Sequence, residues 1–330
     1  MAIRPATHAG SWYTDDAQVL SQQLDGWLDA VPDKTVPIGS VSKQGGEVDI
    51  PTEGARAIIA PHAGYSYSGP AAAWAYKTVD WAKAKKVFLL GPSHHYYLKG
   101  GATTNYDFYE TPLGNLKIDT QTCDEIAETW GLERMARDTD KDEHSLEMHL
   151  PYIYKMLSLH FSPAEMPPLV PIMIGNTSPK TESHYGALLA PYLSSPSNIC
   201  VISSDFAHWG SRFRYTYYRP SPSSTTSPLH LKSQIPELRS HPIHASIKAV
   251  DEESMDAVES GSHEAFLNQL EETGNTVCGR HPIGVFMAAV EAAGVDGGKG
   301  RFRFVRYERS SLVERVGDSS VSYCSGFAVL

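Results

Sequence analysis

Four short apolar runs divide the chain, and they limit its fold more than any other feature of the sequence. The runs cover residues 57–60, 87–90, 169–174 and 199–202. Continuous apolar stretches of this length are typical of strands that are covered on both faces of a sheet. Helical patterns separate or follow these runs at residues 70–80, 120–130, 145–158 and 181–193. This alternation predicts an α/β fold with a largely parallel central sheet that is flanked by helices.

Shorter patterns extend the sheet and its helices toward both ends of the chain. Further helices are expected over residues 17–31, 241–258, 263–272 and 283–293. Two further strands, at residues 301–307 and 320–329, would close the sheet. Segments rich in Pro, Gly and polar residues predict exposed, mobile loops at residues 32–54 and 220–236. With no internal repeat and no convincing domain break, we expect residues 1–330 to form a single domain.

Composition and charge argue against several classes of protein. Of the 330 residues, 41% are hydrophobic and 20% are charged, a balance that argues against a disordered chain. The formal net charge of −10 argues against a nucleic-acid or anionic-membrane binder, because both need a dominant basic face. No apolar run approaches the roughly 18 residues of a membrane span, and the first residues show no secretory signal. Because the four cysteines are also too scattered for a disulfide scaffold, we expect a cytoplasmic protein that could also enter the nucleus.

Residues that can hold a metal follow three of the four apolar runs. His62 follows the first run, His94 and His95 follow the second, and Asp205 and His208 follow the fourth. Because ligands bind outside the carboxyl ends of parallel strands in open α/β sheets, we expect these residues to converge. Imidazole suits zinc, copper, iron and nickel, although a lone loop histidine is more often structural. Three equivalent strand exits that each carry a histidine favour a bound transition metal.

Cys278 is a further candidate, because it lies close to Arg280, His281 and a helix start that Pro282 marks. Neighbouring cations and a helix N-terminus both lower the pKa of a thiol, and the thiolate is the form that ligates a metal. The alternative is that this small side chain only packs. The other cysteines, at positions 123, 200 and 324, lie within expected helices or strands and are expected to be inert.

The segment DEHSLEMHLP, at residues 142–151, does not fit the helix of a zinc protease. Its histidines, His144 and His149, would not share a helical face, and their spacing differs from HEXXH. Glu143 and His144 each share a face with Glu147, so these residues could contact a substrate or support metal ligands. An ordinary acidic helix start is the alternative.

Asp205 and His208 are the best candidates for acid and base catalysis. A carboxylate and an imidazole three residues apart after a strand can exchange protons with a metal-bound ligand. A turn-capping aspartate beside a stacked histidine is the alternative. Arg212 and Arg214 could grip a carboxylate or a phosphate, including phosphotyrosine, although a solvated aromatic strand is the simpler expectation for residues 212–218.

At these residues the sequence resembles the Memo family (mediator of ErbB2-driven cell motility), including its fungal members. The matching segments are HAGSWY (8–13), AIIAPHAGY (57–65), LGPSHH (90–95), DEHSLEMHLP (142–151), SSDFAHWG (203–210), RFRY (212–215), CGRHPIG (278–284) and DSSVSY (318–323). Together they span nearly the whole chain, and their combination is highly specific. The expected loops at 32–54 and 220–236 look longer or more divergent than in animal members.

The resemblance implies a fold similar to that of the LigB-type class III extradiol dioxygenases, whose non-haem iron is held by two histidines and a carboxylate. By motif, His62, His94 and Cys278 match the metal-binding positions of the Memo family. His208 matches the acid/base histidine of the dioxygenases, with Asp205 beside it. A cysteine at the carboxylate position makes the ligand set softer, which favours copper or alters iron chemistry, so ring cleavage is not implied. The family is linked to copper-dependent redox activity, to iron and copper handling, and to motility signalling through phosphorylated receptor tails.

Two hypotheses on function follow. The first is a metal-binding protein that holds copper or iron, with zinc as a further option, on His62, His94 and Cys278. In this hypothesis Asp205 and His208 manage protons during O₂ or superoxide chemistry. The second is a non-catalytic binding module that uses the inherited cleft for a phosphopeptide. Hydrolysis by a zinc-bound water is weaker than both, because no hydrolase spacing is present. The expected partner is an O₂-derived small molecule or a peptide, and neither a nucleic acid nor a membrane.

Overall fold

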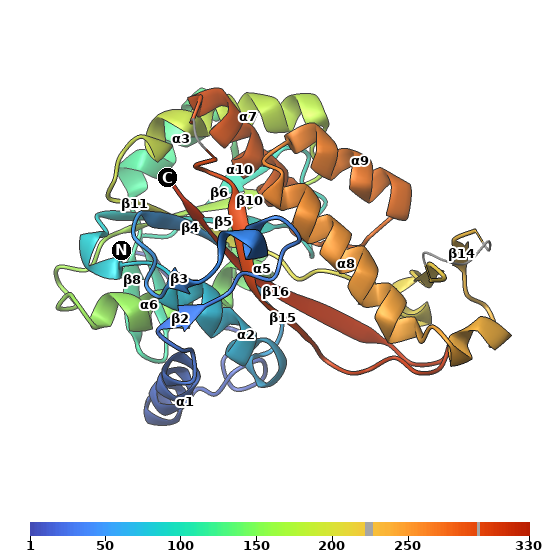
Figure 1. The fold of residues 1–330 in the computed structure, drawn as a ribbon. Helices are drawn as coiled ribbons and strands as arrows, with labels where there is room; N and C mark the ends of the chain where they lie inside the picture. Colours follow the sequence, from blue (N-terminus) through green and yellow to red (C-terminus); the bar gives the residue numbers. More distant parts are fainter. Residues whose placement is uncertain (222–226, 296–297) are drawn as a thin grey trace.

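The computed structural model describes residues 1–221, 227–295 and 298–330, and its centre is a nine-stranded sheet (Figure 1). The strand order is β12-β16-β4-β11-β5-β10-β6-β9, and β15 also pairs with β16. The middle of the sheet consists of four parallel strands, β4 (Ala55–Ala60), β11 (Asn198–Ser203), β5 (Lys86–Pro92) and β10 (Leu169–Ile174). The four apolar runs are therefore the buried parallel strands that their pattern predicts.

Antiparallel pairs flank this parallel centre. Beyond β10 lie β6 (Gly101–Thr103), which is antiparallel to it, and β9 (Glu133–Arg134). Beyond β4 lies β16 (Ser320–Val329), which pairs antiparallel with β4, with β15 (Phe302–Arg309) and with β12 (His208–Trp209). The predicted C-terminal strands thus extend the sheet. The sheet is mixed, because β6 and β16 run antiparallel to the four central strands, while β9 pairs parallel with β6.

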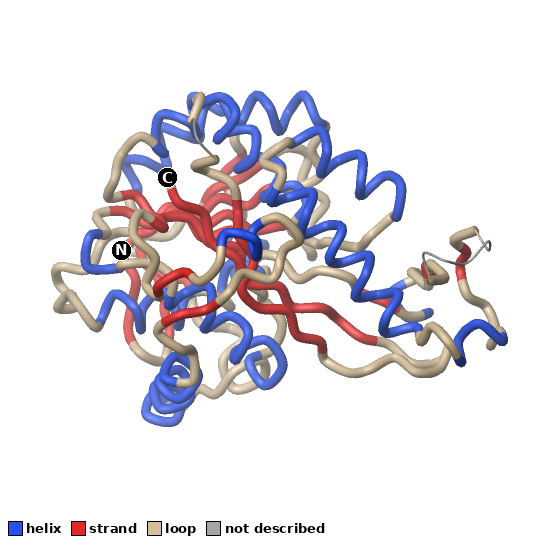
Figure 2. The backbone as a smooth tube through the Cα atoms, in the orientation of Figure 1, coloured by secondary structure: helices blue, strands red, loops and turns tan. Residues whose placement is uncertain are grey.

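Helices cover both faces of the sheet. Figures 1 and 2 show α3 (Thr120–Trp130), α7 (Pro179–Leu193) and α10 (Arg280–Ala293) on one side, with α1 (Ala17–Asp29), α2 (Tyr65–Lys77) and α6 (Leu150–Ser158) on the other. Two further helices, α8 (Ile243–Glu259) and α9 (His263–Thr273), pack against each other, and α8 lies against β15. Among the described residues, no helix is long and apolar enough to cross a membrane.

The single helix predicted at residues 145–158 is wrong, because two helices occupy this segment. After α4 (Arg137–Asp142), the chain forms the short helix α5 (His144–Glu147) and then starts again with α6. Pro151 lies in the first turn of α6 and has no N–H to donate to the carbonyl of Glu147. The interruption ends α5 at Glu147 and leaves it as a single short turn that begins at His144, directly after Glu143.

The segment at residues 32–54 is largely exposed, as its composition predicts, but it is anchored to α8. It contains the pair β2 (Lys34–Thr35) and β3 (Val48–Asp49) and a 3₁₀ helix at Ser42–Gly45. The Glu259 carboxylate accepts hydrogen bonds from the Ser42 N–H and hydroxyl, which ties the segment to the end of α8. Of the other predicted loop, 220–236, residues 222–226 lie outside the described residues.

The aromatic segment at residues 212–218 is not the solvated strand that its sequence predicts. Tyr215, Tyr217 and Tyr218 are buried, and the last two form β13 (Tyr217–Tyr218), which pairs with β14 (Leu229–His230). The three tyrosines belong to a second hydrophobic cluster, which includes Ile243 of α8. They are covered because this part of the chain folds back onto α8.

The three strands β1 (Ile3–Arg4), β7 (Phe108–Thr111) and β8 (Gly114–Lys117) form a small separate sheet. Within it, Arg4 is fully buried, and its guanidinium lies 3.0 Å from Asp140 Oδ1 and 2.7 Å from Glu147 Oε2. Burial opposes the charge of Glu147, but hydrogen bonds from His8 and Arg4 and the charge of Arg4 outweigh it and lower the pKa of Glu147 to about 2. A buried ion pair thus fixes the N-terminal strand to the region of α4 and α5.

Close packing of α7 against α10 depends on Gly186. A Cβ on Gly186 would lie 2.6 Å from the Cβ of Ala288 and 2.7 Å from its backbone carbonyl carbon. Carbon atoms do not approach each other this closely, so any side chain at this position pushes the two helices apart. Gly26 in α1 is different, because a Cβ there would meet no other atom within 4 Å.

Gly186→Ala is expected to lower the free energy of unfolding by about 1–3 kcal/mol, because the added methyl group overpacks the contact between α7 and α10. The matched control is Gly26→Ala, which should raise this free energy by about 0.5–1 kcal/mol through better helix propensity. Urea unfolding followed by circular dichroism measures both values. Equal effects of the two substitutions would contradict the packing argument.

Glu147→Gln is expected to destabilise the protein most at neutral pH. The carboxylate's contribution is complete above its unfolded pKa of 4.5 and is lost as the pH falls toward its folded pKa of about 2. This shift corresponds to about 3 kcal/mol at pH 7. In urea unfolding at pH 7, 5 and 3, the difference between wild type and variant should therefore shrink at the lowest pH. Glu271→Gln, at an exposed position in α9, is the control, and a difference that does not change with pH would refute the assignment.

Candidate metal centre

Three metal-ligating side chains meet at the carboxyl edge of the parallel strands. His62 follows β4, His94 follows β5, and Cys278 lies two residues before the start of α10. Each offers one ligand atom, and the three atoms lie within 4.8 Å of one another. The structure thus brings together the three side chains that the sequence predicts as ligands, while metal binding itself stays a prediction.

Two hydrogen bonds set the orientation of His62. Its Nδ1 lies 2.6 Å from Ser203 Oγ, and this hydroxyl donates to the backbone carbonyl of Ser145 at 2.7 Å. Because the one hydroxyl proton is used in that bond, His62 Nδ1 must be the donor, and its Nε2 keeps a free lone pair. Burial, and after it the neighbouring histidines, holds the pKa of His62 well below its usual value. His62 is therefore a neutral imidazole, which is the form that binds a metal.

The Cys278 thiol lies against His62 and the backbone of Asp205. Its Sγ is 3.2 Å from His62 Nε2, and the Asp205 N–H donates to the sulfur at 3.2 Å. The predicted lowering of its pKa is wrong: burial, followed by the charge of Asp205, raises the pKa of Cys278 well above its usual value. The cation expected at His281 is directed elsewhere, since its Nδ1 lies 2.6 Å from Glu182 Oε1. The thiol therefore keeps its proton until a cation replaces it.

A buried carboxylate sets the orientation of His94. Glu143 accepts the His94 backbone N–H at 2.6 Å, and its other oxygen lies 2.8 Å from His94 Nδ1. Burial opposes the charge of Glu143, but the hydrogen bond from His94 and the charges of His94 and His144 outweigh it and lower the pKa of Glu143 to about 2. An ionised carboxylate can only accept, so Nδ1 donates and His94 Nε2 is left free for a metal. Carboxylates in this position commonly orient metal-ligating histidines.

Aromatic rings cover the ligands on the outside. The His144 ring stacks on His94 with centroids 4.3 Å apart, and the Trp12 ring lies 4.5 Å from His144. His95 Nε2 is 3.3 Å from His144 Nδ1, and His8 contacts both Trp12 and His144. Burial, followed by the charge of His94, lowers the pKa of His144 to about 3. Of the two histidines that the sequence predicts as supporting residues, His144 thus lies directly against His94, and His95 contacts His144.

Asp205 and His208, the predicted acid and base, make separate hydrogen bonds. Asp205 is buried, and its Oδ1 accepts the His62 N–H at 2.9 Å, so the carboxyl group anchors the loop that carries His62. Burial raises the pKa of Asp205. His208 Nδ1 faces the backbone carbonyls of Phe206 at 2.8 Å and Thr276 at 3.2 Å. Carbonyls only accept, so Nδ1 carries the proton and His208 Nε2 is the atom that can accept one.

Two of the predicted supporting residues lie outside the innermost cluster. Glu147 bonds to His8 at 2.8 Å, and among the described residues His8 is the one histidine of the cluster that it contacts. His281 lies in a separate buried group, in which Glu182 bridges His281 and His263 with two contacts of 2.6 Å. The position of His281 near Cys278 in sequence therefore does not place its ring among the ligand atoms.

A groove of about 610 Å³ lies beside the histidine cluster and is lined by Trp12, Tyr67, Arg212 and several serines. The Arg212 guanidinium lies 4.4 Å from the ring centroid of Phe213, which in turn contacts the His208 ring. Arg214 is exposed and is not among the described residues that line the groove. Of the two arginines that the sequence predicts as anion contacts, the structure places Arg212 at the groove.

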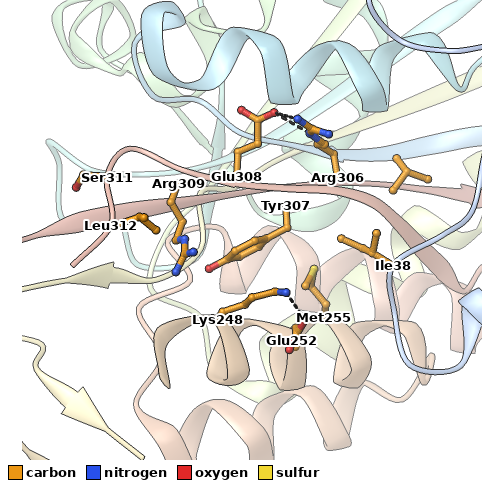
Figure 3. Close-up of a pocket in the computed structure, with 11 residues that line it drawn as sticks. Ile38, Lys248, Glu252, Met255, Arg306, Tyr307, Glu308, Arg309, Ser311 and Leu312 are labelled. Atoms are coloured by element: carbon orange, nitrogen blue, oxygen red, sulfur yellow. Dashed lines mark hydrogen bonds and ion pairs between the residues drawn. The ribbon is translucent and has the colours of Figure 1, made fainter. Parts of the chain in front are cut away.

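A second cavity, of about 640 Å³, lies between α8 and β15 (Figure 3). Its charged side chains are largely paired: Lys248 lies 3.4 Å from Glu252, and Arg306 lies 2.7 Å from Glu308. None of the described residues that line it is a histidine or a cysteine. This cavity therefore does not resemble the histidine-rich edge of the sheet.

Sequence patterns alone do not identify Ser203, His8 or Trp12 as site residues. The segment HAGSWY, at residues 8–13, carries a signal for the last two, because it is among those that resemble the Memo family. Ser203 begins another of these segments, SSDFAHWG at residues 203–210. Its role is not visible there, because it depends on a hydrogen bond to a residue 58 positions away.

Comparison with known proteins places this sequence in a family. The Memo family, described as Memo-like protein, matches residues 4–327. Protein MEMO1 of Homo sapiens is 41% identical over 326 residues, which cover 99% of this chain and 97% of that protein. The MEMO1 family protein MHO1 of Saccharomyces cerevisiae is 38% identical over 352 residues and covers 100% of both chains. A crystal structure of the uncharacterized protein JW3007 from Escherichia coli K12 aligns with a TM-score of 0.45 and 15% identity, covering 82% of this chain and 99% of that chain. By sequence, the chain belongs to the Memo family.

Proposed function

We propose that this chain is a metal-binding protein in which His62, His94 and Cys278 hold copper or iron and support redox chemistry. The observation that carries the proposal is the orientation of the two imidazoles. Ser203 and Glu143 engage the Nδ1 atoms from behind, which leaves both Nε2 atoms without a proton, and His62 Nε2 lies 3.2 Å from the Cys278 sulfur. Two oriented imidazoles beside a thiol are a donor set that a transition metal can use directly.

The donor set also indicates which metals fit. Thiolate sulfur favours Cu(I), while imidazole suits copper, iron and zinc alike. Three protein ligands leave coordination positions open for a small molecule. Bound copper or iron would supply one-electron exchange with O₂ or superoxide. A role in metal and redox homeostasis, or in motility signalling as the resemblance to the Memo family implies, belongs to this proposal.

The surrounding residues have distinct tasks in this proposal. His208 accepts or returns a proton at Nε2, because its Nδ1 is held by backbone carbonyls. Asp205 positions the His62 loop through the His62 N–H. His144 and Trp12 cover the ligands and limit the access of water.

Cys278→Ser is expected to weaken the binding of Cu(I) or Fe(II) by at least about 100-fold, since even residues behind the ligands contribute about 10- to 100-fold. Metal content after purification without added metal, followed by competition with a chelator of known affinity, measures the change. Redox turnover of the loaded protein should fall in parallel.

The matched control is Cys123→Ser, which makes the same chemical change at a buried thiol in α3. It should leave metal affinity unchanged, even if the protein becomes less stable. Unchanged metal content and redox behaviour in Cys278→Ser would refute the proposal.

The groove at Arg212 favours a second candidate function, the binding of an anionic peptide. A guanidinium beside serine hydroxyls and the Tyr67 side chain offers donors for a phosphate and a ring for a neighbouring aromatic group. In this case the chain would bind a phosphotyrosine peptide without catalysis.

Arg212→Gln is expected to weaken the binding of a phosphotyrosine peptide by about 10- to 100-fold, which corresponds to the loss of one charge-assisted contact. Calorimetry with peptides that differ only in phosphorylation measures this change. Arg214→Gln, two residues away and outside the groove, should have little effect. Equal weakening in both variants, or no binding by the wild type, would count against the second candidate.

A further inference from the structure

A second group of metal-ligating atoms lies on the outer side of His94. His94, Glu143 and His144 each offer one ligand atom, and these atoms lie within 4.8 Å of one another. This group, here named the outer site, shares only His94 with the set that contains His62 and Cys278, here named the inner site. The two sets therefore lie side by side with one imidazole between them.

The separations in the outer site suit a metal ion. Glu143 Oε1 lies 2.8 Å from His94 Nδ1 and 3.6 Å from His144 Nδ1. Metal–ligand bonds of about 2.1 Å place neighbouring ligand atoms about 3.0 Å apart in octahedral and about 3.4 Å apart in tetrahedral geometry. The two nitrogens already face one carboxylate oxygen at distances that bracket these values. An ion can therefore enter between them with small side-chain movements.

The histidines of the outer site are more exposed to solvent than His62 of the inner site. The side chain of His94 is 26% exposed and that of His144 is 12% exposed, whereas His62 is buried at 2%. His95 is exposed, and its Nε2 lies 3.3 Å from His144 Nδ1, so it is available as a further ligand. Glu143, at 1% exposure, forms the floor of the site. A cation can therefore reach these side chains from solvent.

We propose that His94, Glu143 and His144 form a second metal site, which binds a divalent transition cation. The inference rests on the proposed function, in which the inner site also holds a metal. The donors of the outer site are two imidazoles and a carboxylate, and none of them is sulfur. This set suits Zn²⁺, Fe²⁺ or Ni²⁺ better than Cu⁺. His94 then bridges the two sites, with Nδ1 on the outer ion and Nε2 on the inner one. The Nδ1 proton, now donated to Glu143, goes to solvent, which leaves His94 as an imidazolate with one negative charge.

Metal titration of the full-length protein tests the second site. Wild type should bind two equivalents of Zn²⁺ in equilibrium dialysis with elemental analysis. Co²⁺ serves as a spectroscopic probe, because a thiolate-to-cobalt absorption band reports the inner site alone. Cys278→Ser should retain one equivalent without that band, and His144→Gln should retain one equivalent with it. The control is His160→Gln, an exposed histidine outside both sites, which should keep two equivalents.

The outcomes separate this inference from the proposed function. One equivalent in wild type that Cys278→Ser removes would overturn the second site and leave the proposed function intact. One equivalent that survives Cys278→Ser but is lost in His144→Gln would support the outer site and refute the inner one. Two equivalents in both wild type and His144→Gln would overturn the inference. If His144→Gln does not fold, the numbers of Zn²⁺ equivalents bound by wild type and by Cys278→Ser still decide whether the outer site exists. If wild type binds no Zn²⁺ at all, both proposals are overturned.

Discussion

The parallel register of β4, β11 and β5 is the constraint on which the candidate centre depends. Ser203, the last residue of β11, pairs with Ala60 of β4, and the residue before it pairs with Leu90 of β5. The three strands therefore end close to one level, with His62 two residues beyond Ala60 and His94 four residues beyond Leu90. Carboxyl ends of parallel strands meet at one edge, so this register alone delivers two imidazoles to the same place. A slip of one residue would turn each side chain to the opposite face.

The strand register places His62 and His94 at the edge of the sheet, but it does not orient their imidazole rings. The groups that orient these rings come from a different part of the chain. The backbone carbonyl of Ser145 accepts a hydrogen bond from the Ser203 hydroxyl, which in turn orients His62. The Glu143 carboxylate orients His94. Ser145 and Glu143 both belong to the region of α5. The buried guanidinium of Arg4 ties this region down by donating hydrogen bonds to the Glu147 carboxylate and to the backbone carbonyls of Asp140 and Glu143. The geometry at the edge of the sheet thus depends on an ion pair formed by the fourth residue of the chain.

The position of a candidate metal site at the carboxyl edge of the sheet could be predicted from the sequence, because His62 and His94 each follow an apolar run and this pattern is local. Cys278 could also be found, since a cysteine before a helix start is visible as a pattern. The direction of the shift in the pKa of Cys278 could not be predicted, because burial decides it and burial depends on the packing of the whole fold. Ser203 was equally hidden, since its role requires a partner on another element. The break of the predicted helix at 145–158 was signalled by Pro151, but the resulting position of the carboxylate at His94 required the tertiary structure.

Charge balance distinguishes the inner and outer sites further. With neutral imidazoles, the Cys278 thiolate contributes one negative charge, so a monovalent ion leaves the inner site neutral, whereas a divalent ion leaves one positive charge. Burying such a charge is costly unless a partner compensates it. Glu143 is that partner, because its low pKa keeps it ionised behind His94. A divalent ion in the outer site would be neutralised by Glu143 and by the His94 imidazolate together, so Glu143 would no longer compensate a charge in the inner site. Occupation of the outer site by a divalent ion therefore biases the inner site toward Cu(I), the ion that its sulfur ligand already favours.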